Sequence, residues 1–247
     1  MIKKLWLGLF LLTMLLPFGS ASPVVDNFQK ANELYASGKY SEAVKEYQKV
    51  IQASPVAEVF YNLGNAYFKD KQIGNAILNY ERAKRLDPRD SDVRSNLIYA
   101  NQLIEYKIED KRNWLLRQIA AGADYLRFKE CWLLFLGSYF IFTLFLAFSF
   151  IRKRLVFGKL GTTLFIILIV CLFPLLLKLS ENRMKDEAVI TAKQAEARYG
   201  PSTLDRIAFR LPEGLKVSVE DSRQDWQRIR LKDGRSAWVR GSEMSII

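Results

Sequence analysis

Two long apolar runs in the second half of the chain constrain its fold more than any other feature. The first run, 131–151, holds 21 residues without a charge and would be about 31 Å long as a helix. The second, 160–177, would be about 27 Å long, and it extends to residue 179 if Lys178 reaches toward lipid headgroups. Because a bilayer has a hydrocarbon core of about 30 Å, we expect two transmembrane helices, at 130–151 and 160–179.

Charge around these runs indicates how they lie in the membrane. The connection 152–159 carries four basic residues and no acidic residue, which places it in the cytoplasm by the positive-inside rule. Residues 1–21 join a Lys-Lys pair to a short apolar run and then to small residues, as in a secretory signal peptide cleaved after Ala21; an uncleaved anchor is the alternative. Both readings place the N-terminal and C-terminal parts on the exported side of the membrane.

Composition excludes several classes of site. The chain has no histidine and two cysteines, so it cannot form a Ser-His pair, a histidine-ligated zinc site or a zinc site of four thiolates. Both cysteines, Cys131 and Cys171, fall in the apolar runs, and neither soluble part is expected to hold a disulfide. We therefore predict no catalytic residues, no metal and no cofactor. The net charge of +11 does not indicate nucleic-acid binding, because six of these excess charges lie in 1–21 and 130–180.

The segment 24–110 contains a self-match at an offset of 33 residues. Ala43 aligns with Ala76, and Tyr47 aligns with Tyr80. Repeats of this period are stacked helix pairs. The second unit, from Phe-Tyr-Asn-Leu-Gly-Asn-Ala-Tyr at 60–67 to Asp-Pro at 87–88, resembles a tetratricopeptide repeat at nearly every signature position. Gly64 and Ala76 are expected to be small because the two helices cross closely there.

A third helix, at about 91–108, is expected to close the open end of the two repeats. Asp90 begins a run that can cap its N-terminus. The following segment, 111–129, is rich in apolar and aromatic residues and predicts an amphipathic stretch at the membrane interface. Packing of this segment against the repeats is an alternative that the sequence leaves open.

The resemblance to tetratricopeptide repeats implies a concave groove lined by the first helix of each unit, where such arrays bind peptides. Asparagine could bridge peptide amides, aromatic rings could supply contact area, and lysine could attract a carboxylate. A solvated scaffold surface is the alternative interpretation. The residues carried over to this protein-binding groove are Asn32, Tyr35, Tyr61, Asn65, Phe68, Lys69, Asn96 and Tyr99.

Residues 186–247 change to short β-branched runs separated by Gly and Pro, which predicts a small all-β barrel of five or six strands. Lys-Asp-Gly-Arg at 232–235 is a hairpin turn. The string 197–202, with the later Gly and Trp positions, resembles a bacterial SH3 domain, although Ala197 and Ala237 replace the more usual Val and Gly. That resemblance implies a surface for peptides or cell wall near Tyr199 and Trp226; packing of the tryptophan is equally compatible.

The sequence therefore predicts a multidomain membrane protein with an all-α tetratricopeptide helical repeat, a two-helix transmembrane hairpin and a small all-β SH3-like barrel. This order resembles the BatE family of bacterial aerotolerance operons. The resemblance implies a non-catalytic adaptor in an envelope complex linked to aerotolerance or stress. Its implied partners are membrane proteins of the Bat type with von Willebrand factor A domains and, indirectly, a MoxR-type ATPase. The alternative is a module that binds or senses peptidoglycan through the barrel.

Overall fold

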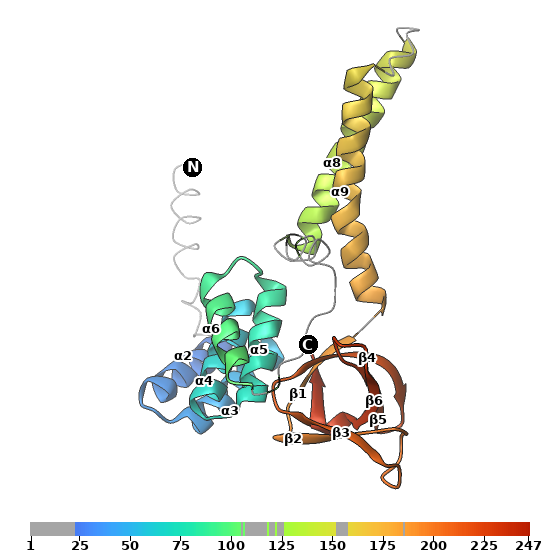
Figure 1. Cartoon of the computed structure of the whole chain (residues 1–247). Coiled ribbons are helices and arrows are strands. Elements are labelled where there is room, and N and C mark those ends of the chain that lie inside the picture. Colours follow the sequence, from blue (N-terminus) through green and yellow to red (C-terminus); the bar gives the residue numbers. More distant parts are fainter. Residues whose placement is uncertain are drawn as a thin grey trace, which may run out of the picture.

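The computed structural model describes residues 23–104, 106, 118, 122, 126–151, 158–184 and 186–247. Figure 1 shows three parts: a bundle of short helices, a long pair of helices and a β-barrel. Each part belongs to the class that the sequence predicted. The predicted signal peptide, most of the segment 111–129 and residues 152–157 of the basic loop lie outside the described residues.

The helical bundle consists of two helix pairs followed by a single helix. Its core is formed by alanine, tyrosine and aliphatic side chains, and Ala43, Tyr47, Ala76 and Tyr80 are all at most 2% exposed. These are the residues that match at the offset of 33, so the self-match marks the buried positions. The helices are α2 (Pro23–Ala36), α3 (Tyr40–Ala53), α4 (Ala57–Lys69), α5 (Ile73–Leu86) and α6 (Ser91–Gln102).

The crossing of α4 and α5 is as close as the small residues predicted. A Cβ atom added to Gly64 would lie 2.7 Å from the ring of Tyr80, which leaves no room for a side chain. At the end of the array, the carboxylate of Asp90 accepts hydrogen bonds from the amides of Asp92 and Val93 and caps α6, as expected. Helix α6 ends at Gln102, earlier than the predicted limit near 108.

The two apolar helices pack along each other and extend away from the other parts (Figure 1). Helix α8 (Phe128–Ile151) and the segment Lys159–Leu176 of α9 (Lys159–Met184) are long and apolar enough to cross a membrane. Large side chains are exposed along α8, including Leu133 at 69% and Phe140 at 63%, as expected of a lipid-facing surface. Helix α9 continues beyond Pro174 to Met184, so the proline does not end it.

The strands within 186–247 form one antiparallel sheet of seven strands in the order β3-β2-β6-β5-β4-β1-β7. This is one or two strands more than predicted, because a short strand at the C-terminus pairs with β1. Gly234 has φ +94° in the predicted turn between β5 and β6. The strands are β1 (Asp186–Ile190), β2 (Gln194–Arg198), β3 (Ile207–Pro212), β4 (Lys216–Arg223), β5 (Trp226–Arg230), β6 (Ser236–Arg240) and β7 (Met244–Ile246).

The repeats and the barrel touch each other, which the sequence did not predict. Helix α5 lies beside strand β1 (Figure 1). Val189 of β1 belongs to the apolar core of the repeats, and Tyr106, just after α6, packs against the core of the barrel. The turn between α5 and α6 also contacts the start of α8, through Arg89–Glu130 and Asp87–Arg127 ion pairs of 2.8 Å each. All three parts therefore meet around α5 and the turn that follows it.

Candidate peptide-binding groove

The predicted groove contains a small open pocket between the two repeats. Its volume is about 110 Å³. Helices α2 and α4 supply most of its lining, as expected if the first helix of each unit faces the groove. The residues that line it are Asn32, Tyr35, Tyr47, Asn62 and Asn65.

One hydrogen bond recurs in both repeats and fixes the groove asparagines. The hydroxyl of Tyr47 donates to Oδ1 of Asn32 at 2.5 Å, and the hydroxyl of Tyr80 donates to Oδ1 of Asn65 at 2.7 Å. Both pairs are separated by 15 residues and are related by the repeat offset of 33. The tyrosines come from the second helix of each unit, so each bond ties the groove wall to the core behind it.

Asn65 is the centre of a larger network. Its Oδ1 also accepts a hydrogen bond of 2.9 Å from Nδ2 of Asn96 on α6, and the same Nδ2 lies 3.2 Å from the hydroxyl of Tyr61. The two lone pairs of Oδ1 are thus both used. The structure therefore brings three predicted groove residues, Tyr61, Asn65 and Asn96, together across α4 and α6.

The other predicted groove residues are three aromatic residues and Lys69. The rings of Phe68 and Tyr99 lie 5.6 Å apart between centroids, and Tyr99 is 56% exposed. Tyr35 packs edge-to-face on Tyr40, at 5.4 Å between centroids. Lys69 is exposed, one turn after Asn65 on α4, and it makes no ion pair with any residue that the structure describes.

Burial disfavours ionisation of the two buried tyrosines. Desolvation raises the pKa of Tyr47 to about 12, and it raises the pKa of Tyr80 further. Both hydroxyls carry their protons at neutral pH and can donate to the asparagine oxygens that face them.

This arrangement determines what the groove offers a ligand. With their oxygens turned to the tyrosines, Asn32 and Asn65 keep their amide Nδ2 groups for other partners, and within the described residues neither group makes a hydrogen bond. The Lys69 ammonium adds further donors on the same helix. Asn32 and Asn65 consequently present donors to the groove, and bridging of both N–H and C=O groups of a peptide by its asparagines stays a prediction.

Sequence reasoning missed two groove residues. Asn62 lines the pocket because it lies three residues before Asn65 on the same face of α4, and helical periodicity could have identified it. Tyr47, known from the sequence only by its alignment with Tyr80, is 2% exposed, and its hydroxyl donates a hydrogen bond to Asn32 in the pocket lining. No pattern in the sequence indicates that the hydroxyl of a buried tyrosine reaches the groove.

The barrel carries the second predicted surface, and its two residues differ in exposure. Tyr199 is 74% exposed at the end of β2, as an open aromatic surface requires. Trp226 is only 8% exposed, and the guanidinium of Arg240 lies over its ring at 5.6 Å from the centroid. The environment of Trp226 agrees with the packing alternative.

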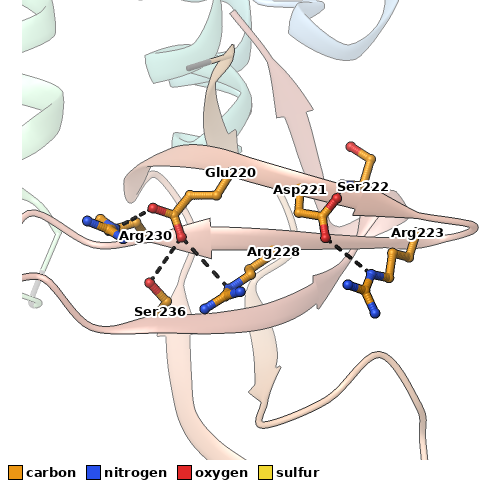
Figure 2. Close-up of polar contacts among 7 residues, drawn as sticks. All are labelled: Glu220, Asp221, Ser222, Arg223, Arg228, Arg230 and Ser236. Carbon is orange, nitrogen blue, oxygen red and sulfur yellow. Dashed lines mark hydrogen bonds and ion pairs between the residues drawn. The ribbon is translucent and has the colours of Figure 1, made fainter. Parts of the chain in front are cut away.

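The sheet around Trp226 is held by arginine–carboxylate contacts. Figure 2 shows the carboxylate of Glu220 facing Arg228, Arg230 and Ser236, and the carboxylate of Asp221 facing Arg223. Arg223 also lies over the ring of Trp238, 5.2 Å from its centroid. These contacts link β4, β5 and β6 and occupy the arginines with internal partners.

Comparisons with known families support the predicted domain types of the helical bundle and the barrel. Residues 31–71 match the family model described as TPR repeat, and residues 57–90 match that of the tetratricopeptide repeat. Residues 191–245 match the bacterial SH3 domain. A search of curated proteins gives no match. Both matched domain types are typically non-catalytic binding modules, and tetratricopeptide repeats indicate protein partners.

Proposed function

We propose that the chain is a non-catalytic, membrane-anchored adaptor that binds other proteins through the groove of its tetratricopeptide repeats. The observation that carries this proposal is the orientation of the groove asparagines. Tyr47 and Tyr80 hold the oxygens of Asn32 and Asn65, so the amide donors are directed to a ligand. The matching acceptors in a protein are main-chain carbonyl oxygens and carboxylates. The ligand is then an extended segment with a carboxylate near Lys69.

Contact between the repeats and the barrel supports a particular topology. The two parts flank both apolar helices in the chain, and Gly74 and Glu213 are hydrogen bonded at 3.1 Å. If α8 and α9 both cross the bilayer, the repeats and the barrel must lie on the same side. The signal-like start and the basic connection support an exported location for that side. A periplasm-active reporter fused after Ile247 should be active, and one inserted between Arg154 and Lys159 inactive; the reverse result would contradict the exported location.

The order of the parts suggests which proteins the adaptor contacts. As in the BatE family, the proposed partners are membrane proteins with von Willebrand factor A domains, acting in an envelope complex linked to aerotolerance or stress. Contact with a MoxR-type ATPase would be indirect, because an exported groove does not meet the cytoplasm.

Charge reversal in the groove tests this function. Full-length protein with Lys69→Glu and Asn32→Asp should capture a co-expressed von Willebrand factor A membrane protein about tenfold or more weakly in detergent, because charge-assisted and neutral hydrogen bonds are lost. Lys45→Glu, an exposed lysine on α3, is the matched control and should not change capture. Equal capture by the groove variant and the control would place recognition elsewhere.

A second candidate is binding of peptidoglycan by the barrel, which the exposure of Tyr199 favours. The tip of the β2–β3 loop also presents Leu204, 94% exposed, while Arg198 holds the backbone of this loop through the carbonyls of Thr203 and Asp205. Sedimentation of the full protein in detergent with sacculi tests this candidate. Retention that Tyr199→Ala and Leu204→Ser abolish would favour it over the adaptor function.

A further inference from the structure

Helix α5 lacks a cap from its own sequence, and the barrel supplies one. The side chain of Gln72, the N-cap residue, makes no capping hydrogen bond, and the first turn of α5 contains no acidic residue. Instead, Oε2 of Glu213, in the β3–β4 turn, accepts a hydrogen bond of 3.1 Å from the amide of Gly74. A carboxylate at this position satisfies a free amide and interacts favourably with the helix dipole.

The contact around this cap is between main chains and is too close for side chains. A Cβ atom on Gly74 would lie 2.7 Å from the carbonyl oxygen of Ile190 in β1 and 3.1 Å from the amide of Gly214. Gly214 has φ +84°, and a Cβ atom there would lie 2.8 Å from the side chain of Ile77 on α5. Each part therefore has a glycine where the other approaches.

Polar contacts continue along α5 from this point to its C-terminal end. Lys216 of β4 lies 3.2 Å from Glu81 of α5, and it also pairs with Glu187 of β1 at 2.8 Å. Further along, the guanidinium groups of Arg82 and Arg85 donate hydrogen bonds of 2.6 Å to the main-chain oxygens of Ile246 and Ile247, in and just after β7. The barrel thus contacts α5 from its first turn to its last.

The same helix faces the groove on its other side. Tyr80, which holds Asn65, belongs to α5, as do Gly74 and Glu81, which contact the barrel. A short array of two repeats usually needs a further unit to cover its exposed apolar side. Here Val189 of the barrel lies within the core of the repeats and provides part of that cover.

We propose that the SH3-like barrel is the intramolecular partner of the repeats. Its surface of β1, β7 and the β3–β4 turn caps and covers α5, so that the groove and the barrel form one body on the membrane anchor. This surface of the barrel is consequently closed to outside ligands. The inference goes beyond the proposed adaptor function, since it holds whatever the groove binds.

Gly74→Ala tests the docking by the sign of its effect. In a helix that faced solvent, alanine would stabilise α5 relative to glycine. In the docked protein the added Cβ must push the barrel away. Hydrogen exchange of the full protein in nanodiscs should then become about tenfold or more faster in α5 and β1. Slower or unchanged exchange in both elements would overturn the proposal.

Two controls separate undocking from general unfolding. Gly137→Ala, on α8, adds a Cβ atom with no neighbouring atom within 4 Å and should leave exchange in α5 and β1 unchanged. Exchange in α3 and in the β5–β6 hairpin should stay slow in Gly74→Ala, because both lie outside the contact. If these elements also lose protection, Glu213→Ala, which removes only the cap, should still speed exchange at the start of α5. Unchanged exchange there would contradict the role of the barrel.

A carbodiimide cross-link tests whether the partner is in the same chain. This reagent joins a carboxylate directly to an amine, and the Glu81–Lys216 pair at 3.2 Å meets that requirement. In a mixture of light and heavy isotope-labelled protein, the linked peptides should be light–light or heavy–heavy only. Mixed peptides would show that the barrel docks on a second copy. Linkage of Lys216 to Glu187 without any linkage to Glu81 would show that the barrel does not dock on α5.

Discussion

The hydroxyl of Tyr80 donates a hydrogen bond of 2.7 Å to Oδ1 of Asn65, which links the core of the second repeat to its groove. Tyr80 is 1% exposed, so its hydroxyl depends on this acceptor. The sequence predicted Asn65 only as a residue of the protein-binding groove. The structure shows a half-buried side chain that also holds Asn96, and a variant here affects stability as well as binding.

Asn65→Ala is therefore expected to destabilise the repeats by about 1 to 3 kcal/mol, the cost of leaving a buried hydroxyl without its partner. Hydrogen exchange of peptides in α4, α5 and α6 of the full protein measures this loss. Tyr80→Phe removes the donor as well. In that background Asn65→Ala should cost clearly less, and equal costs in the two backgrounds would show that the bond contributes nothing.

The repeats were predictable because their information is local. Ala43 and Ala76, or Tyr47 and Tyr80, recur at a fixed offset and are buried by a neighbouring helix of the same unit. The barrel strands follow from alternation and turn residues such as Gly234 in the same way.

The contact between the parts has no such signal. Gly74 and Glu213 are 139 residues apart, and each is unremarkable in its own segment. A glycine in the first turn of a helix and a glutamate in a turn between strands become meaningful only when the parts are placed together. The same holds for the groove, where the distance between α4 and α6 decides that Asn96 donates to Asn65.

Ala76→Leu should overpack the crossing of α4 and α5. Ala76 is 0% exposed, so the larger side chain must displace its neighbours at a cost of about 1 to 3 kcal/mol. Faster exchange of peptides in α4 and α5 would report this cost. Ile98→Ala, which changes a side chain 60% exposed on α6, is the control and should change exchange little. Unchanged exchange in Ala76→Leu would contradict the close helix pair.

Lys71→Gly should stabilise the second repeat. Lys71, in the turn that follows α4, has φ 63°, a conformation that glycine adopts without strain, and Gly38 has φ +77° at the equivalent position of the first repeat. After allowance for the greater freedom of glycine in the unfolded chain, the expected gain is about 0.5 to 1 kcal/mol. Slower exchange in α4 and α5 measures it. Lys71→Ala keeps the strained Cβ and should give no gain in stability. An equal gain in this variant would show that the stabilisation comes from removing the charge.

Glu46 should make the first repeat sensitive to acid. Its carboxylate lies 2.9 Å from the ammonium groups of both Lys30 and Lys49, and their hydrogen bonds lower its pKa below the ordinary value of 4.5. Because the folded-state pKa is the lower one, the stabilisation is complete above 4.5 and disappears as the pH falls through the lowered value. The urea midpoint of α2 and α3, followed by pulsed hydrogen exchange, should be lower in Glu46→Gln than in the wild type near neutral pH. The two midpoints should converge in acid.

Glu42→Gln, which changes an exposed glutamate on the same helix, is the control and should shift the midpoint little at any pH. If the difference between Glu46→Gln and the wild type stays constant with pH, packing rather than charge holds the Glu46 side chain.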